Sequence, residues 1–346
     1  MISYSINLKN IENSLRQTGI EAEDAFYTIA HLYIQNYNPP SSPRLENIAE
    51  RGKKIVENSM LLNIFQLQSF IKSDPKGELL PVLYQFFLSK RFRDSTGKFF
   101  TPHSIASSMT SMLPVVEGAI IMDPTCGGGT FLIEASKRWK NLNCTLIGND
   151  IDNSLLDLSE LVLSLGSPLI HKKQLINSNI FQPIIEFESF YEKVDYILAN
   201  PPFSLQINDI SVPSKLFKLG YQNSDAIFLD IANKLLKPGG RLICLLPHSI
   251  ISNKEFFNLR QSIEEDWNLL GVIILPEGVF HLTSNTTTRA DILIIEKKGK
   301  VPPSKVLFCN APSVGIPLNG HQLNIDDNAL EEIISNDETL AILNLR

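Results

Sequence analysis

The chain has 346 residues with a formal net charge of −6, and 43% of its residues are hydrophobic and 20% charged. This length predicts roughly two domains and supplies enough apolar residues for a sizeable core. The composition excludes collagen-like, disordered and disulfide-stapled proteins. No apolar run reaches the length of about 18 residues that a membrane helix needs, and residues 1–10 lack the basic and apolar regions of a leader peptide. We therefore expect a cytoplasmic protein with neither a membrane span nor a membrane partner.

The cysteines and histidines give no sign of a metal site. The four cysteines lie far apart without Cys-x-x-Cys spacing and the six histidines are scattered, so free thiols are expected. The acidic balance is unusual for a protein that binds nucleic acid, because such binding needs local clusters of Lys and Arg whatever the total charge. Two segments supply such clusters, although each is also typical of a solvated surface: Lys90, Arg91, Arg93 and Lys98, then Lys297, Lys298 and Lys300.

Residues 1–96 are expected to form an all-α domain. Phe26, Ile29 and Tyr33 have the spacing of one helical face, and no strand-like alternation appears in this part of the sequence. The prolines and serines of segment 39–43 predict a break between two helices.

From about residue 119 the pattern changes to short apolar runs separated by segments of helical length. This alternation predicts βα units, and therefore a doubly wound, Rossmann-like α/β fold with a mainly parallel sheet over residues 97–300. A weaker pattern and two adjacent prolines predict that residues 301–346 leave the sheet as a short C-terminal extension. The predicted strands are 119–122, 144–148, 173–176, 194–198, 241–246, 271–275 and 292–295, and the clearest helices are 130–139 and 226–236.

A glycine-rich turn, Asp-Pro-Thr-Cys-Gly-Gly-Gly-Thr-Phe at 123–131, follows the first predicted strand and precedes a helix. Its three glycines permit positive φ and a close approach of a ligand to the backbone, and helix N-terminal amides favour an anionic group. Such a turn alone is weak evidence, because it is also a common structural connection. Asp150, however, closes the next strand, where an acidic side chain commonly accepts ribose hydroxyls. With Asp123 at the end of the first strand, this predicts a nucleoside cofactor without choosing between NAD and S-adenosylmethionine.

The segment Asn200-Pro201-Pro202-Phe203 follows directly after the predicted strand 194–198. Its prolines lack backbone donors and fix φ, so the chain cannot turn at once into a helix and carbonyl oxygens are left exposed at the cleft. The Asn200 side-chain oxygen and the Pro201 carbonyl can accept both hydrogens of an exocyclic amino group, which frees the lone pair of its nitrogen. Phe203 can stack on a base that has left the duplex. The alternative, a loop whose Phe packs in the core, is disfavoured by the strand before it and the glycine turn upstream.

Three motifs occur in a characteristic order: Gly-Lys-Phe-Phe-Thr-Pro at 97–102, the glycine turn, and the Asn-Pro-Pro-Phe turn. In this order the sequence resembles the N6-adenine DNA methyltransferases, specifically the modification subunits of type I restriction-modification systems. The likeness extends over about residues 75–300, and the helical part before it also suits the family. The resemblance implies the S-adenosylmethionine-dependent methyltransferase fold. It also implies transfer of a methyl group from S-adenosylmethionine to adenine N6 in DNA, within a restriction-modification or related defence system.

The resemblance also assigns roles to individual residues. The catalytic turn would be Asn200, Pro201, Pro202 and Phe203, which match the family's pattern without departure. The cofactor would be bound by Phe99, Thr101, Pro102, Asp123, Thr125, Gly127, Gly129, Asp150 and Asn179. Of these, the first three would line the methionine end, Asp123 and the two glycines would hold the amino-acid portion, and Asp150 would hold the ribose. Asn179 would face the adenine ring, where the family usually has Asp.

The resemblance implies partners as well. DNA is the expected substrate, and the long segment 204–224 after the catalytic turn is expected to help hold the flipped base or DNA. No segment looks like a target-recognition domain, and the chain ends earlier than type I modification subunits usually do. Two expectations stay open: the chain depends on a separate specificity subunit for its choice of DNA sequence, with a restriction subunit as a further candidate partner, or it is a shortened or specialised relative of these subunits.

Two other functions stay open at this point. RNA and protein-glutamine methyltransferases also use Asn-Pro-Pro-aromatic turns, since they too methylate a planar nitrogen, and the glycine turn resembles that of the RNA guanine-N2 enzymes. The Phe-Thr-Pro motif upstream of the glycines, and the lack of an evident RNA-binding module, favour DNA over these substrates. The second alternative is a catalytically idle scaffold in a larger assembly, against which the intact Asn-Pro-Pro-Phe turn argues.

Overall fold

The computed structural model describes residues 11, 15, 17, 19–58, 64–84, 87, 100–280, 289–299, 301, 303–316, 318 and 327–345. The chain forms two compact units. Unit 1 contains residues 1–96 and 154–167, and unit 2 contains residues 97–153 and 168–346. The contacts therefore group segment 154–167 with the N-terminal helices and segment 301–346 with the sheet, whereas the division into functional domains stays a prediction.

Unit 1 is helical in the part that the structure describes, as predicted. The predicted face of α2 is buried, with Phe26 2%, Ile29 1% and Tyr33 0% exposed. The predicted break is confirmed, because α2 ends at Tyr37 and the next helix begins at Pro43. Asn38, which follows α2, has a left-handed conformation with φ 43°. The helices that contribute to this unit are α2 (Ala22–Tyr37), α3 (Pro43–Asn58), α4 (Ile64–Ser73) and α8 (Asn153–Gly166).

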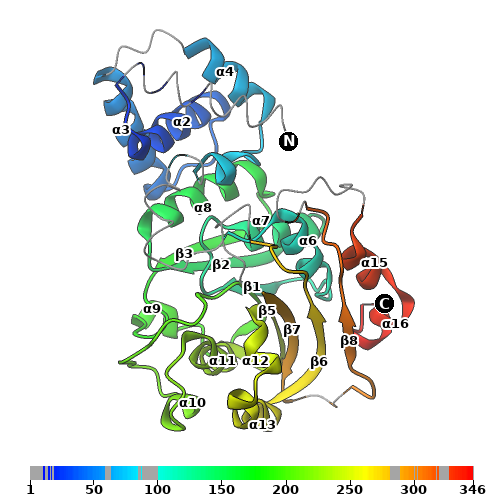
Figure 1. The fold of residues 1–346 in the computed structure, drawn as a ribbon. Coiled ribbons are helices and arrows are strands. Elements are labelled where there is room, and N and C mark those ends of the chain that lie inside the picture. Colours follow the sequence, from blue (N-terminus) through cyan, green and yellow to red (C-terminus); the bar gives the residue numbers. More distant parts are fainter. Residues whose placement is uncertain are drawn as a thin grey trace. The chain divides into compact units, whose positions relative to one another are not determined.

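Unit 2 contains, among the described residues, one eight-stranded sheet in the order β3-β2-β1-β4-β5-β7-β6-β8 (Figure 1). Strands β1 to β5 are parallel to their neighbours in this group, β7 is antiparallel to both β5 and β6, and β8 is parallel to β6. The predicted doubly wound, mainly parallel sheet is confirmed. The strands are β1 (Ala119–Asp123), β2 (Cys144–Asp150), β3 (Lys172–Asn177), β4 (Val194–Ala199), β5 (Leu236–Pro247), β6 (Trp267–Ile274), β7 (Ala290–Lys297) and β8 (Leu307–Asn310).

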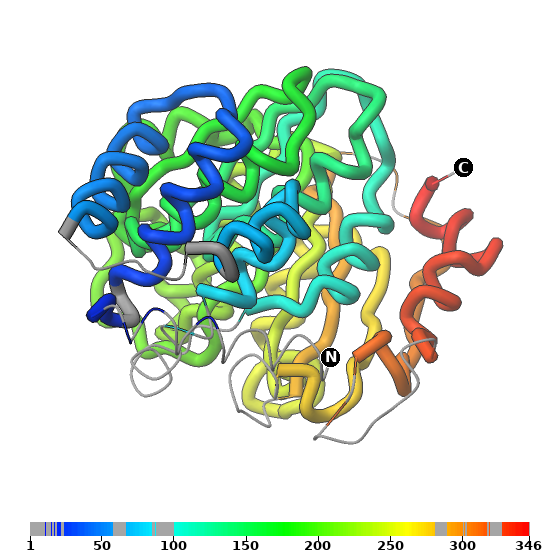
Figure 2. The backbone as a smooth tube through the Cα atoms, turned by 90° about the horizontal axis from the view of Figure 1, so that it is seen from above, coloured from blue at the N-terminus to red at the C-terminus, as the bar shows by residue number. Residues whose placement is uncertain are grey.

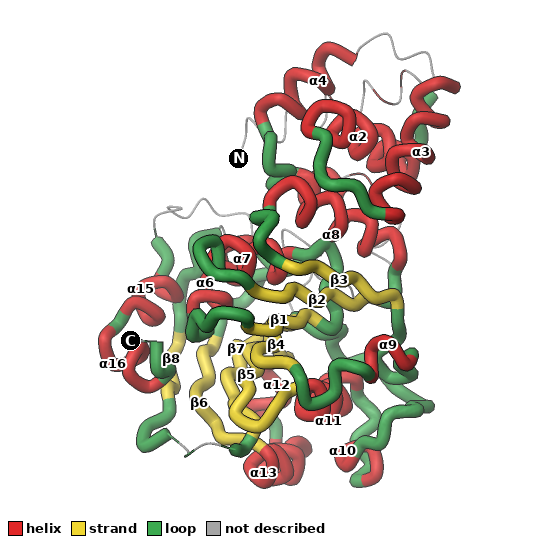
Figure 3. The backbone as a smooth tube through the Cα atoms, turned by 180° about the vertical axis from the view of Figure 1, so that it is seen from behind, coloured by secondary structure: helices red, strands yellow, loops and turns green. Residues whose placement is uncertain are grey.

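Helices cover both faces of this sheet, with α6 and α7 on one face and α11 and α13 on the other (Figures 1 and 3). The central strands are apolar along their length because both of their faces are covered. Leu242 to Leu246 on β5, for example, are each 0% exposed. The helices are α6 (His103–Ser111), α7 (Thr130–Arg138), α9 (Ile185–Glu188), α10 (Lys215–Lys218), α11 (Ser224–Leu235), α12 (His248–Ser252), α13 (Phe257–Asp266), α15 (Ala329–Ser335) and α16 (Asp337–Ile342), with a 3-10 turn at Lys254–Phe256.

The C-terminal part differs from the sequence prediction, which had it leave the sheet. Strand β8 pairs in parallel with β6, with Leu307 opposite Gly271. This strand is hard to recognise in the sequence because it is short and lies at the edge of the sheet, where Phe308 is 68% exposed and none of its four residues is buried. A Cβ at residue 271 would lie 2.9 Å from the Leu307 Cβ, so the glycine permits this pairing.

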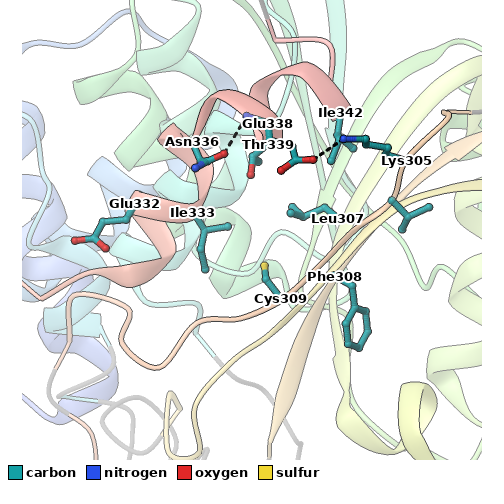
Figure 4. A pocket seen from close by; sticks show the side chains of 11 residues that line it. Lys305, Leu307, Phe308, Cys309, Glu332, Ile333, Asn336, Glu338, Thr339 and Ile342 are labelled. Carbon is teal, nitrogen blue, oxygen red and sulfur yellow. Dashed lines mark hydrogen bonds and ion pairs between the residues drawn. The ribbon is translucent and has the colours of Figure 1, made fainter.

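Helices α15 and α16 follow β8 and lie next to each other (Figure 2). Together with β8 they line a hollow of about 640 Å³, to which Leu307, Cys309, Ile333 and Thr339 contribute (Figure 4). None of the predicted site residues lines this hollow. Within the described ranges, no helix has both the length and the hydrophobicity to cross a membrane.

Candidate active site

The sheet reverses its winding direction between β1 and β4. From β1 the order continues through β2 to β3, whereas from β4 it continues through β5 on the opposite side. Ligands of doubly wound sheets bind at such a switch point, beyond the carboxyl ends of the strands. The glycine turn follows β1, Asp150 ends β2, and the Asn-Pro-Pro-Phe turn follows β4. The topology therefore brings the two predicted motifs to the two sides of one crevice.

The glycine turn has the backbone conformation that its composition predicts. Gly127 and Gly129 have φ values of 51° and 80°, in the left-handed region that favours glycine. Asp123 is 1% exposed, and its Oδ1 accepts the Thr125 backbone N–H at 3.0 Å. The turn ends at the N-terminus of α7, whose first amides lack partners within the helix and so face the crevice as donors.

The end of β2 fixes the position of this turn. Asn149 donates from Nδ2 to the Pro124 carbonyl at 2.9 Å, and its own carbonyl accepts the Cys126 N–H at 2.8 Å. Asp150 accepts the Gly127 N–H on Oδ2 at 2.8 Å. Asn149, which is 0% exposed, was not among the predicted site residues, whereas Asp150 was. The sequence signal that could have identified Asn149 is its position, as a polar residue in an apolar strand directly before Asp150.

Gly148 allows α7 to approach β2 closely. A Cβ at this position would lie 2.7 Å from Leu175 Cδ2, 2.8 Å from Leu132 Cδ1 and 3.0 Å from Cys126 Sγ. The close packing places the glycine turn, which contains Cys126, directly against the end of β2.

Two carboxyl groups lie close together beside the glycine turn. Burial raises the pKa of Asp123 well above its ordinary value, and the charge of the nearby Asp150 raises it further. Their oxygens can accept hydrogen bonds from hydroxyl and amino groups of a nucleoside cofactor.

The predicted methionine-end residues lie beside the catalytic turn. Thr101 is half-buried, and its Oγ1 accepts a hydrogen bond from Asn200 Nδ2 at 3.2 Å. Pro102 is buried and precedes α6. Phe99, together with the rest of segment 97–99, lies outside the described residues. The Thr101–Asn200 contact joins the predicted cofactor set to the predicted catalytic set.

Asn179 lies two residues beyond β3, as predicted. It is half-buried, and its Oδ1 accepts the Phe181 backbone N–H at 3.0 Å within its own turn. The preceding Ser178 donates its N–H to the Asp150 carbonyl at 3.2 Å, which places this turn next to the end of β2. With Oδ1 engaged, the Asn179 side chain offers an N–H donor, where the Asp usual in the family would offer an acceptor.

The Asn-Pro-Pro-Phe turn leaves β4 directly. Asn200 is half-buried, Pro201 is buried and Phe203 is 7% exposed. The Phe203 ring packs edge-on against Phe280, with their centroids 6.0 Å apart. Ser204, which ends the turn, has a φ of 54°, an uncommon conformation for a residue with a side chain.

The beginning of α11 supports this turn, which the sequence analysis did not foresee. Ser224 donates its hydroxyl to the Pro202 carbonyl at 2.6 Å, and Asp225 accepts the Ser204 N–H on Oδ2 at 2.8 Å. Ser224 and Asp225 are 0% and 1% exposed. The sequence predicted that this helix begins at residue 226. The two polar residues before it were not selected, because polar residues before an apolar helix are typical of an ordinary N-terminal cap.

The segment 204–224 is structured over its length and contains α10. Val212 and Leu216 are 2% and 3% exposed, and the Leu216 N–H donates to Asp230 Oδ2 on α11 at 2.8 Å. Its two ends approach each other, since the Ile207 N–H donates to the Gln222 carbonyl at 2.7 Å. The expected role of this segment in holding DNA stays a prediction.

A half-buried histidine and a buried aspartate form a polar pair at the same edge of the sheet. His248, directly after β5, contacts Asp291 Oδ2 through Nδ1 at 2.8 Å. Asp291 is 0% exposed, and burial raises its pKa. The sequence analysis did not select either residue, because they are 43 positions apart in the chain.

The strand order and the two turns at its switch point define the Rossmann-like fold of the S-adenosylmethionine-dependent methyltransferases. A family model described as N-6 DNA Methylase matches residues 76–338. The chain therefore belongs to the N-6 DNA methylase family, as its three ordered motifs predicted.

Individual relatives of two kinds are similar to the chain, DNA methylase subunits and an RNA guanine-N2 methyltransferase. The chain is 25% identical over 271 residues to the type I restriction enzyme MjaVIII methylase subunit of Methanocaldococcus jannaschii, covering 72% of this chain and 46% of the relative. It is 31% identical over 143 residues to the U6 snRNA (guanine-N(2))-methyltransferase THUMPD2 of Bos taurus, covering 41% of this chain and 25% of the relative. The crystal structure of the type I restriction-modification system methyltransferase subunit from Streptococcus thermophilus has a TM-score of 0.56 at 20% identity, covering 85% of this chain and 62% of that chain. The chain spans about half the length of the type I methylase subunits that it matches.

Proposed function

We propose that this protein transfers a methyl group from S-adenosylmethionine to the N6 amino group of adenine in DNA, as the modification component of a restriction-modification or related defence system. One observation carries the proposal: the glycine turn after β1 and the Asn-Pro-Pro-Phe turn after β4 face one crevice, in a chain of the N-6 DNA methylase family.

The residues around the glycine turn fit S-adenosylmethionine. When bound, this cofactor supplies a methyl group on a positively charged sulfur. The oxygens of the buried Asp123 and of Asp150 can accept hydrogen bonds from amino and hydroxyl groups of the cofactor, and the amides at the start of α7 suit the carboxylate of an amino acid. We assign the amino-acid portion to Asp123, Thr125 and the two glycines, and the ribose to Asp150. The methionine end is assigned to Phe99, Thr101 and Pro102, and the adenine to Asn179.

The catalytic turn acts on the amino group of the substrate base. The lone pair of an exocyclic amino group is delocalised into the ring, so the nitrogen is a poor nucleophile. Asn200 Oδ1 and the Pro201 carbonyl accept its two hydrogens, which favours a tetrahedral nitrogen whose lone pair is available. The contact between Asn200 Nδ2 and Thr101 orients the amide. Phe203 stacks on the base once it has left the duplex.

A second candidate is methylation of guanine N2 in RNA. The similarity to the THUMPD2 enzyme over 143 residues supports it, and a planar exocyclic amino group is again the target. The family match over 76–338 supports the DNA substrate over a larger part of the chain.

Two proteins are proposed as partners: a separate specificity subunit, which would choose the DNA sequence, and a restriction subunit. The similarity to type I methylase subunits supports this proposal.

The proposal is tested by transfer of a labelled methyl group from S-adenosylmethionine to unmethylated duplex DNA, with Asn200→Ala as the blank. The labelled nucleoside is then identified after digestion. N6-methyladenine from DNA supports the proposal, whereas N2-methylguanine from RNA in a parallel reaction supports the second candidate. No label in either nucleic acid, with cofactor bound and neighbouring gene products added, would indicate a scaffold and refute the proposal.

A further inference from the structure

We infer that Ser224 and Asp225, at the start of α11, are positioning residues that hold the Asn200–Phe203 turn in its catalytic conformation. This inference rests on the proposed function for the meaning of that turn. It assigns the two residues no contact with substrate or cofactor.

The turn needs support from outside because its own sequence supplies little. Pro201 and Pro202 have no backbone N–H, so they cannot donate hydrogen bonds to a neighbouring strand or helix. Ser204 then requires a left-handed conformation with φ 54°, which a residue with a Cβ adopts only when its surroundings favour it. A turn with few donors and one strained residue would otherwise sample several conformations.

The start of α11 supplies the missing bonds. The Ser224 hydroxyl bridges the turn, donating to the Pro202 carbonyl at 2.6 Å and accepting the Leu205 N–H at 3.0 Å. The Ser224 N–H also donates to the Leu205 carbonyl at 2.9 Å. The Asp225 carboxylate accepts the N–H of the strained Ser204 at 2.8 Å. These bonds hold the carbonyl of Pro202 and the N–H of Ser204. They therefore fix the backbone around Phe203, which lies between the two groups.

The cost of burying Asp225 indicates that the contact is specific. A carboxylate 1% exposed is unfavourable unless its partners compensate. Oδ2 accepts the Ser204 N–H at 2.8 Å and, further away, Asn223 Nδ2 at 3.4 Å. The backbone N–H of Asp225 itself also contributes a hydrogen bond to the carboxylate. No charged partner of Asp225 occurs among the ion pairs of the described residues. Its strongest contact is with the turn itself.

Four variants separate positioning from general stability. Asp225→Ala removes the acceptor of the Ser204 N–H. Asp225→Asn keeps an acceptor oxygen for the Ser204 N–H, removes the charge and replaces the other carboxylate oxygen by an amide nitrogen. Ser204→Gly, alone and combined with Asp225→Ala, removes the strain that the carboxylate offsets, because glycine adopts positive φ readily.

The first measurement is amide hydrogen exchange of a peptide that contains residues 203–205, made on the full chain without DNA. Loss of a hydrogen bond to a charged group predicts that Asp225→Ala raises exchange at these amides by about tenfold or more. Asp225→Asn is expected to stay near the wild type, whereas the double variant should remain unprotected, because glycine supplies no acceptor for the N–H of residue 204. Unchanged exchange in Asp225→Ala, in a protein whose circular dichroism is native, would overturn the inference.

The second measurement is the methyl-transfer rate and the cofactor affinity of the same variants. We expect Asp225→Ala to lower kcat by about tenfold or more while the Kd of S-adenosylmethionine changes by less than about twofold, and the double variant to regain activity. An equal loss in kcat and cofactor affinity, or no rescue by Ser204→Gly or Asp225→Asn, would show a merely structural role. The exchange measurement needs no substrate, so a wild type that transfers no methyl group would refute the proposed function alone.

Discussion

Replacement of Asp225 by asparagine should change how stability depends on pH. Burial raises the pKa of Asp225 from an ordinary value of 3.8 to about 6. The folded chain therefore binds this proton more tightly than the unfolded chain between about pH 4 and about pH 6. The contribution of Asp225 to the free energy of unfolding is largest below this window, falls as pH rises through it, and is constant above it.

The size of the effect follows from the pKa difference. At 1.36 kcal/mol per pH unit, Asp225 loses about 2–3 kcal/mol of stabilisation between pH 4 and pH 7. Asparagine does not titrate, so the free energy of unfolding of the variant minus that of the wild type should rise by this amount over the same interval. The Asn amide nitrogen would occupy the position of Oδ1, which is buried without a hydrogen-bond partner among the described residues. Burial of this amide nitrogen without a partner costs about 1–3 kcal/mol. This cost lowers the free energy of unfolding of the variant by the same amount at every pH, so it does not change the pH dependence.

Urea unfolding followed by tryptophan fluorescence measures this difference in the relevant unit. Both tryptophans of the chain, Trp139 and Trp267, are buried in unit 2. An Asp209→Asn variant is the matched control, because it makes the same substitution at an exposed position of the same unit. A difference between Asp225→Asn and wild type that stays constant from pH 4 to pH 7 would show that Asp225 is not desolvated in the folded chain.

Three further predictions concern the crevice. Asn200→Ala should abolish methyl transfer and leave the Kd of S-adenosylmethionine nearly unchanged in a binding titration; a collapse of cofactor affinity would mean that Asn200 is structural. Phe203→Ala should weaken DNA-dependent steps by about 1–3 kcal/mol, as for loss of a stacked base, whereas Phe280→Ala should lower mainly thermal stability. Equal effects of these two variants on DNA binding would contradict stacking by Phe203. Gly148→Ala should cost about 1–3 kcal/mol in urea unfolding through overpacking and should also weaken cofactor binding, because the added Cβ would lie 3.0 Å from Cys126 Sγ in the glycine turn. Lost stability with intact cofactor affinity would show that the turn adapts.

The sequence by itself determined the strands β1 to β7 and the positions of both motifs. Strands such as β2 and β4 are visible as short apolar runs because a strand covered on both faces must be apolar throughout. The glycines at 127 and 129 were predicted to allow positive φ and have it. A parallel sheet places the ends of its strands along one edge, so a motif directly after a strand is located as soon as the strand is recognised.

The edge strand β8 was decided by the tertiary structure. In the described part of the chain only β6 pairs with β8. Phe308 is exposed to solvent, so an apolar side chain in this strand does not mark a position in the core. A four-residue strand of this kind has too few buried positions to be distinguished from a loop.

The support of the catalytic turn was also decided by the tertiary structure. Ser204 and Asp225 are 21 positions apart, and local spacing carries no information about a bond across such a distance. The same holds for Asn200 and Thr101, which are 99 positions apart. The sequence identifies candidate groups for the chemistry because their residue types can be recognised without the fold. The neighbours that orient these groups, and that shift their pKa values, are brought together by the packing of distant segments. Their effects arise only in the folded chain, because desolvation and hydrogen bonding of these groups depend on that packing.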